Sequence, residues 1–180
     1  MDFAEENAYT LGVQAKLWGY PLTCYVQTTE ASVRVGAAHI NTFRRFSELK
    51  TAADRYVVTP NNVTLDAYAV FDVRTEPVVV HVPALPELRW YIVPVTGSTR
   101  SSPTSAGSKG PRAGAYLITG PDFRGEPPGD MTVIRSRTTQ GLVAVRVFVN
   151  GQDDVAAAAD VQAGFNVIPV ETRRDAEPFA

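Results

Sequence analysis

The chain has 180 residues, of which 44% are apolar and 20% charged, and its formal net charge is −2. These values suit one globular domain with a buried core and exclude a strongly basic surface for nucleic acid. The single cysteine, Cys24, excludes an internal disulfide, and the two histidines, His39 and His81, lack the spacing of metal ligands, so we expect neither a metal nor a cofactor.

The first residues are acidic and contain no hydrophobic signal core. No stretch of the sequence reaches the roughly 20 apolar residues that span a bilayer. We therefore expect a cytoplasmic protein without membrane contact, or a periplasmic or secreted one if a leader precedes this sequence.

A first helix is predicted over residues 3–19, where apolar residues step by four and three along one face. Pro21 should end or kink this helix, because proline lacks a backbone donor and restricts Tyr20. We expect a second helix from Pro21 to about Arg34. The apolar face consists of Ala4, Ala8, Leu11, Ala15, Trp18 and Leu22.

Residues 35–50 show no regular period, and two arginines stand between Phe43 and Phe46. The segment is predicted to be a surface loop anchored by the phenylalanines, with Arg44 and Arg45 solvated. The alternative is that these two arginines bind an anion.

From Arg55 the period changes to two, which indicates strands. The stretch from Arg55 to Asp72 is predicted to be a strand, a polar corner at residues 60–62 and a second strand, and we expect the fold to be organised around it. Gly- and Pro-containing turns separate further strands. These strands are predicted at residues 78–82, 89–93, 115–119, 132–135 and 142–149.

The last predicted helix covers Val155–Ala163, begins at Asp153 or Asp154 as its cap, and ends at Gly164. Short strands without helices between them favour an antiparallel sandwich. We expect an α+β fold in one structural domain, with N-terminal helices packed on the sandwich. Its parts are a helical lead-in (1–50), the sandwich (51–150) with a flexible loop (96–114) that is either a lid or disordered, and a C-terminal helix and tail (151–180).

Four motifs occur in order along the chain, and in this combination the chain resembles the bacterial family of unknown function DUF1254 over about residues 8–170. The resemblance implies a β-sandwich of jelly-roll type. It also implies a second, C-terminal domain in many relatives, which we expect to be absent here. The motifs are Trp18-Gly19-Tyr20-Pro21-Leu22, Asn41-Thr42-Phe43, Thr59-Pro60-Asn61-Asn62-x-Thr64-Leu65 and Gly114-x-Tyr116-Leu117-Ile118-x-Gly120-Pro121.

Some two-domain relatives resemble peptide-N-glycosidases in fold, which suggests hydrolysis of glycan or amide bonds by analogy. Two positions of this chain depart from the family pattern. Val63 stands where relatives commonly carry an acid, and the segment after Val93 lacks the polar and acidic residues common there. If those acids are catalytic in relatives, this chain has lost them.

The polar corner supplies the candidate ligand-binding residues, which either bind sugar hydroxyls or a carboxylate, or satisfy the backbone of a tight turn. Trp90 is a further candidate, as a stacking platform for a sugar or an apolar ligand. Together the ligand-binding candidates are Asn61, Asn62, Thr64, Asp66, Tyr68 and Trp90.

The sequence contains no nucleophile motif, phosphate loop or zinc-protease motif. Cys24 lies on a predicted helix among apolar neighbours, which indicates a buried hydrophobe rather than a catalytic thiol. Asp66 and Asp72 lie on one strand, about 20 Å apart, which is too far for a direct acid/base pair. Asp66 can instead act with Glu76, or with Arg55 on the neighbouring strand, which makes Asp66 and Glu76 the candidate catalytic acids. The alternative is that these side chains only form an exposed sheet face.

Three functions stay open. The first is a binding domain for a small polar ligand or glycan, with a pocket between helices and sheet near Asn61, Asn62 and Asp66. The second is a hydrolase of glycan or amide bonds that uses Asp66 and Glu76. The third is a structural module that forms a homo-oligomer, because a single sandwich leaves strand edges free to pair.

Overall fold

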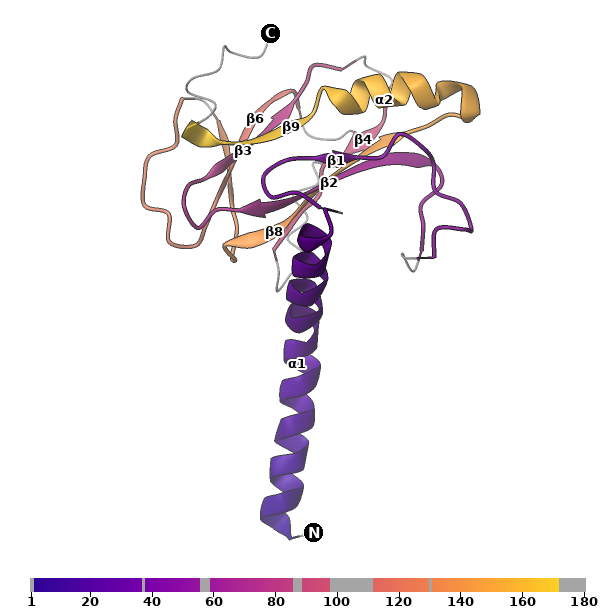
Figure 1. Cartoon of the computed structure of the whole chain (residues 1–180). Helices are drawn as coiled ribbons and strands as arrows, with labels where there is room; N and C mark the ends of the chain where they lie inside the picture. The colour runs from indigo at the N-terminus through magenta and orange to yellow at the C-terminus, as the bar shows by residue number, and fades with distance from the viewer. Residues whose placement is uncertain are drawn as a thin grey trace.

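The structure is a computed structural model that describes residues 2–36, 38–55, 59–85, 89–97, 112–129 and 131–171. It contains a long helix, α1 (Phe3–Arg34), two β-sheets and a short helix, α2 (Val155–Ala163), so the fold is α+β. Figure 1 shows α1 projecting away from the sheets, with α2 on the other side of the sheets in this view. The two sheets and α2 are called the sheet body below.

Helix α1 is continuous, so the prediction of two helices divided at Pro21 is wrong. It begins with a capping box, in which Asp2 and Glu5 each accept a hydrogen bond from the other's backbone amide. Pro21 removes one helical hydrogen bond, but every residue on either side adds one as the helix propagates. The hydroxyl of Thr23 also donates to the carbonyl of Gly19, close to the proline.

Helix α1 has no buried residue, so the expected packing of the N-terminal helices on the sheets is wrong for most of its length. The sheets and α2 already enclose the core, so only the end of the helix has an apolar surface of the sheet body to cover, around Ile40 and Val70. Only the end of α1 approaches the sheet body, where Cys24, Tyr25, Thr29 and Val33 are half-buried. Within the described residues, no helix is both long and apolar enough to cross a membrane.

Sheet A has five strands in the order β1-β2-β8-β4, with β5 also paired to β8, and all its pairs are antiparallel. Strands β2 and β8 pair over nine residues each, from Thr64 opposite Phe148 to Asp72 opposite Gln140. The bounds are β1 (Arg44–Arg45), β2 (Thr64–Asp72), β4 (Tyr91–Ile92), β5 (Val95–Gly97) and β8 (Gln140–Phe148).

Sheet B has four strands in the order β7-β6-β3-β9. Strands β6 and β7 are parallel, so the expectation of a wholly antiparallel sandwich is wrong at this edge. The segment between them is long enough to return the chain to the same end of the sheet, as a parallel pair requires. The bounds are β3 (Val78–Val82), β6 (Gly114–Thr119), β7 (Thr132–Arg135) and β9 (Asn166–Pro169).

A jelly roll is not confirmed, because a five-stranded sheet and a mixed four-stranded sheet stand in place of two four-stranded antiparallel ones. The short strands β1, β5 and β9 were not predicted. The expected flexible loop 96–114 is wrong at both ends, because β5 contains Thr96 and Gly97 and β6 begins at Gly114. Residues 56–58 of the expected first strand and residues 98–111 of the expected flexible loop lie outside the described residues.

The hydrophobic core lies between the two sheets and is closed at one side by α2. Alternate residues of the central strands point into it, as the period of two requires. The ring of Phe165, which follows α2, packs edge-to-face on Tyr91 with centroids 5.3 Å apart. The core side chains include Leu65, Ala67, Ala69 and Phe71 of β2, Val143, Val145 and Val147 of β8, Val78, Val80 and Val82 of β3, and Ala158 of α2.

The predicted cap of α2 takes a different role. Asp154 occupies the cap position, but its carboxylate makes no hydrogen bond to the helix amides. It accepts two hydrogen bonds from the guanidinium of Arg89 and one from the amide of Asn150. These bonds, chiefly those from Arg89, lower the pKa of Asp154 to about 2. The pair ties the segment before β4 to the start of α2.

Candidate functional site

The predicted polar residues of β2 lie on the outer face of sheet A, the face turned away from sheet B. Because successive strand residues alternate, the residues between the core positions of β2 and β8 point to this face. On β2 they are Thr64, Asp66, Tyr68, Val70 and Asp72, which lie opposite Phe148, Arg146, Ala144, Leu142 and Gln140 of β8.

The polar corner before β2 is tied to its own backbone. The side-chain oxygen of Asn61 accepts a hydrogen bond of 2.9 Å from the amide of Val63, which closes a tight turn. The carbonyl of Val63 in turn accepts from the amide of Val149. Asn62 is exposed beside this turn. These hydrogen bonds therefore hold the backbone of the corner in the position from which β2 begins.

Asp66 is the centre of a buried polar cluster and is only 3% exposed. Its carboxylate accepts hydrogen bonds from the hydroxyls of Thr64, at 2.8 Å, and Tyr68, at 2.5 Å. The Nε of Arg146 lies 3.9 Å from the same carboxylate. Burial, together with the hydrogen bond to Asp66 and its charge, raises the pKa of Tyr68 to about 12.

Arg146 was missed by the sequence analysis. It lies directly opposite Asp66 in the register of β2 and β8, and its Nε is buried without a hydrogen-bond partner among the described residues. A signal was available, because Arg146 is the one charged residue in the apolar stretch Leu142–Val149. An outward-facing charge in such a strand indicates a partner on the neighbouring strand.

Cations and an aromatic ring cover one side of the Asp66 cluster. Phe46 packs edge-on against Tyr68 with centroids 6.0 Å apart. The Nζ of Lys50 lies 3.7 Å from the centre of the Phe46 ring, and the guanidinium of Arg44 lies 5.2 Å from it. These contacts shield Asp66 from solvent and hold the segment after β1 against the sheet.

The adjacent residues Arg44 and Arg45 make contacts with different parts of the sheet body. Arg45 donates to the carbonyl of Phe165 and to the side chain of Asn166, just beyond the end of α2. Burial lowers the pKa of Arg45. Arg44 lies over Phe46 on the outer face. The pair does not form one anion site, because the two guanidiniums contact different parts of the sheet body.

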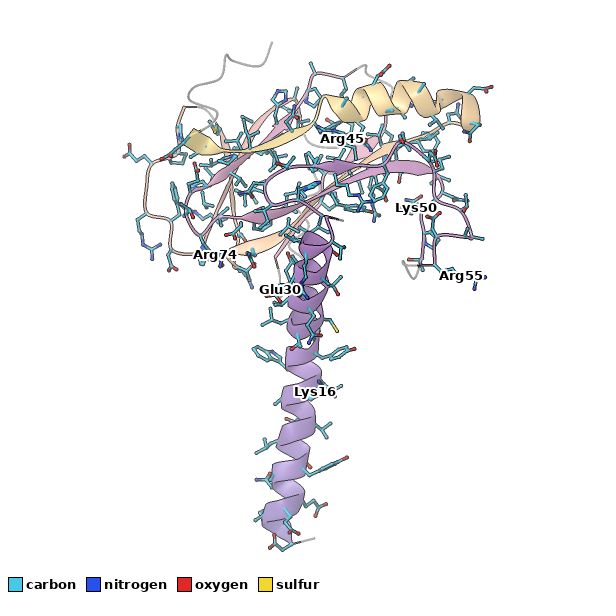
Figure 2. The ribbon with its side chains drawn as sticks, in the orientation of Figure 1. Lys16, Glu30, Arg45, Lys50, Arg55 and Arg74 are labelled. Carbon is cyan, nitrogen blue, oxygen red and sulfur yellow. The ribbon has the colours of Figure 1, made fainter. Side chains whose placement is uncertain are left out.

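A cavity of about 390 Å³, called the helix–sheet pocket, lies between the end of α1 and the outer face of sheet A. Figure 2 shows Glu30 and Arg74 near the place where α1 meets the sheet. Apolar and polar side chains share its lining. They are Val26, Thr29, Glu30, Val33 and Arg34 of α1, with Ile40, Val70, Arg74 and Gln140.

A hydrogen-bonded network around Asp72 forms the polar wall of this pocket. The carboxylate of Asp72 accepts from the guanidinium of Arg74 and, at 2.9 Å, from the amide of Gln140. Burial opposes ionisation, but these hydrogen bonds hold the pKa of Asp72 below its ordinary value. Asn41 bonds both the amide and the carbonyl of Asp72, which fixes this end of β2.

Tyr25 lies in the C-terminal part of α1, close enough to Asp72 for the phenol and the carboxylate to interact. Its hydroxyl is buried and has no hydrogen-bond partner among the described residues. Burial, and then the charge of Asp72, raises the pKa of Tyr25, although the nearby Thr29 acts in the opposite direction. The hydroxyl is therefore a neutral donor at neutral pH.

Glu76 lies apart from Asp66. It follows the end of β2, while Asp66 lies near the start of that strand. Its carboxylate accepts a hydrogen bond of 2.9 Å from the amide of Glu171. Glu76 and Asp122 line a second, smaller cavity of about 240 Å³.

None of the ligand-binding residues named from the sequence lines the helix–sheet pocket or the smaller cavity beside Glu76. Trp90 precedes β4 and is partly exposed, away from both. No group of three or more His, Cys, Asp or Glu side chains in the described part of the chain is arranged to hold a metal ion.

The model of the family described as "Protein of unknown function (DUF1254)" matches residues 40–169, well over half of the chain. The chain belongs to this family. The matched region contains the Asp66 cluster and the sheet side of the helix–sheet pocket, whereas α1 precedes it. No curated protein matches this chain.

Among solved structures, the chain is similar to the VPA0106 protein of Vibrio parahaemolyticus, with a TM-score of 0.74 and 20% identity over 92% of this chain. That coverage exceeds the part of the chain that follows α1, so it includes part of the helix. The chain spans only 39% of VPA0106. The match to a putative uncharacterized protein from Burkholderia cenocepacia covers 74% of this chain and 36% of that protein, with a TM-score of 0.39 and 10% identity.

Proposed function

We propose that the protein is a binding module that holds a small polar ligand with an apolar part in the helix–sheet pocket. The observation that carries this proposal is the mixed lining of a cavity of about 390 Å³. Small-molecule sites commonly measure about 300–1,000 Å³ and combine apolar walls with a few placed polar groups. Val26, Val33 and Val70 supply such walls here, and Gln140 and Arg34 supply polar groups.

The charges around the pocket favour a neutral or zwitterionic ligand. Arg34 and Arg74 are balanced by Glu30 and by Asp72, which binds Arg74. A ligand with a large net charge would meet the opposing charge of one of these groups at short range. Hydroxyl, amide or ammonium–carboxylate groups suit the lining better, which agrees with a sugar or an amino-acid-like compound.

The Asp66 cluster supports this function by shaping the sheet. The polar atoms of Thr64, Asp66 and Tyr68 are engaged with one another, and Asn61 is engaged with backbone. Of the residues named from the sequence, Asn62 and Trp90 keep exposed surface and stay the candidates for a contact outside the pocket.

Amide NMR shifts on titration with glucose, N-acetylglucosamine and leucine test the proposal. At least one probe is expected to move the amides of Val33, Ile40 and Val70. The variant Ile40→Trp should fill the pocket mouth and abolish these shifts, whereas the matched variant Val63→Trp, at an exposed apolar residue of the corner, should not. If the shifted amides are instead those of Asn62 and Trp90, the ligand binds at the polar corner, and the proposed site in the helix–sheet pocket is wrong.

Hydrolysis of a glycan or amide bond is the second proposal, and one observation favours it. Glu76 and Asp122 line the same smaller cavity, and paired carboxylates are the usual groups of a glycosidase. A hydrolytic activity lost in both Glu76→Gln and Asp122→Asn, but kept in Asp66→Asn, would support this site. A hydrolytic activity that survives both changes would rule out this cavity as the active site.

A further inference from the structure

Helix α1 exposes large apolar side chains along most of its length. Trp18 is 84% and Leu17 71% exposed, and Phe3 and Leu11 are also open to solvent. Figures 1 and 2 show the helix standing away from the sheet body, with side chains projecting all round it. A helix with this much exposed apolar surface is stable when another surface covers it.

One stripe of α1 has the spacing of a helix–helix interface. Its positions alternate in steps of four and three over the whole helix, which is the a and d pattern of a coiled coil. Every side chain in it is uncharged. The stripe, called the α1 stripe, consists of Ala4, Ala8, Leu11, Ala15, Trp18, Leu22, Tyr25 and Thr29. Its last two members are half-buried beside the sheet body, and the exposed part of the stripe ends at Leu22.

The opposite side of the helix carries a shorter uncharged row with the same steps, which Glu6 interrupts at its N-terminal end. It consists of Thr10, Val13, Leu17, Tyr20 and Cys24. Tyr9 and Lys16 lie beside this row, with Lys16 between Val13 and Tyr20 in the sequence. The Nζ of Lys16 lies 5.2 Å from the centre of the Tyr20 ring. A cation beside this row, already held by an aromatic ring of the row, makes this side less suited to an apolar interface than the α1 stripe.

We infer that α1 pairs with α1 of a second copy of this chain, antiparallel and along the α1 stripe. The stripe is self-complementary in this orientation about a two-fold axis near Ala15. In the outer pairs, a small residue of one copy then faces a large residue of the other, and two Leu11–Trp18 contacts flank the central Ala15–Ala15 contact. The facing pairs are Ala4 with Tyr25, Ala8 with Leu22, Leu11 with Trp18, and Ala15 with its counterpart.

A parallel pair fits the same stripe poorly. Trp18 would face Trp18, and Tyr25 would face Tyr25, while Ala4 and Ala8 would leave a gap. Close packing is easier where large residues meet small ones, and the antiparallel pair provides this at Ala4 with Tyr25 and at Ala8 with Leu22.

Charge also favours the antiparallel orientation. Asp2 caps α1, its first turn carries Glu5 and Glu6, and Arg34 lies in its last turn. A parallel pair would bring both acidic turns together and align both helix dipoles, which is unfavourable. An antiparallel pair separates the two acidic turns and sets the helix dipoles in opposite directions, which is favourable.

The sheet bodies leave room for this arrangement. With the axis near Ala15, each Arg34 lies about 28 Å from the centre of the pair, at 1.5 Å per residue. The two bodies would then sit at opposite ends, about 57 Å apart, and would not collide. The partner helix begins about 10 Å before the end of α1, which leaves the helix–sheet pocket outside the main interface.

Sedimentation of the full chain, with two matched variants, tests the inference. Leu11→Glu places a charge in the α1 stripe, and Leu17→Glu places the same charge outside it. We expect a dimer whose dissociation constant rises at least about 100-fold in Leu11→Glu, because an unpaired charge is buried, and less than about 3-fold in Leu17→Glu. Circular dichroism checks that both variants keep the fold.

Disulfide trapping in a Cys24→Ser background then tests the orientation. A mixture of Ala8→Cys and Leu22→Cys chains should form a mixed disulfide, and Ala8→Cys alone should not. A wild-type chain that stays monomeric at high micromolar concentration, equal effects of the two glutamate variants, or a disulfide between two Ala8→Cys chains would each overturn the inference.

Discussion

The sheet body and α1 are built from the same kinds of residue and end in opposite states. In the sheet body, Phe71, Leu65 and Val145 have no exposed surface. In α1, none of the 32 residues is buried, although the helix carries Phe, Trp, Leu and Tyr side chains. The difference shows that an apolar stripe in a sequence predicts a surface that will be covered, but not which surface covers it.

The two regions also differ in how their backbone hydrogen bonds are formed. Each strand of the sheet body is bonded to neighbours far away in the sequence, whereas α1 is bonded almost entirely to itself. Helix formation from local hydrogen bonds alone is marginal in water. The sheet body should therefore respond to substitutions in its core, and α1 to substitutions in its stripe.

Phe71→Ala should have the largest effect on the sheet body. The side chain is fully buried between the sheets, and its loss leaves a cavity that costs about 4 kcal/mol of the free energy of unfolding. Leu17→Ala, at an exposed site of α1, should stay within about 0.5 kcal/mol. Urea unfolding followed by tryptophan fluorescence measures both, and similar losses would break the contrast between the regions.

Gly141→Ala should follow, at about 3 kcal/mol of destabilisation. A Cβ at Gly141 would lie 2.2 Å from the carbonyl oxygen of Thr96 and 2.3 Å from the ring of Phe71, so the backbone of β5 would have to move. The matched change in α1, Gly12→Ala, has nothing within 4 Å of the new Cβ. It should stabilise the helix by about 1 kcal/mol, seen as slower amide exchange in α1.

Asp66→Ala should cost about 2 kcal/mol, because the hydroxyls of Thr64 and Tyr68 lose their acceptor in a buried place. Asn62→Ala, at an exposed residue, should change the free energy of unfolding by less than about 0.5 kcal/mol. Thermal unfolding of both variants measures the difference. If Asp66→Ala leaves the free energy of unfolding unchanged, the Asp66 cluster does not stabilise the sheet body.

The smallest effect is expected from pH. The pKa of Asp154 is about 2 in the folded chain, below the ordinary value of about 3.9 that it regains on unfolding. The Arg89 pair therefore stabilises the fold above about pH 4, and this contribution is lost as the pH falls towards 2. Urea unfolding between these pH values should show a shallower pH slope for Asp154→Asn than for the wild type and for the control Asp153→Asn.

Much of the fold could be predicted from the sequence because its signals are local. The alternation along β2 and β8, and the β-branched run of β3, determine which residues reach the core. The break at Pro21 was wrong because one lost hydrogen bond does not stop a helix with many turns on both sides. Strands β1, β5 and β9 were missed because two, three and four residues are too few to show a period. Their pairing with distant strands defines them.

The candidate site could be predicted only in part. A pocket between helix and sheet was expected, but near Asn61 and Asp66, whereas the described cavity lies at the other end of β2, beside Val70. Polarity in the sequence marked Asp66 and Asn61 without showing that each already has a partner. Arg74, Gln140 and Arg34 come together only through the pairing of β2 with β8 and the position of α1, which no local pattern encodes.

The long-range register of β2 has a consequence for how the chain acquires its shape. Asp72 pairs with Gln140 and Thr64 with Phe148, while β3 pairs with β9 near the end of the described chain. During synthesis, the apolar strand β2 leaves the ribosome long before β8 exists. Folding dominated by such distant pairings is slow and exposes unpaired strands. Newly made chains should therefore depend on chaperones until the last strand arrives.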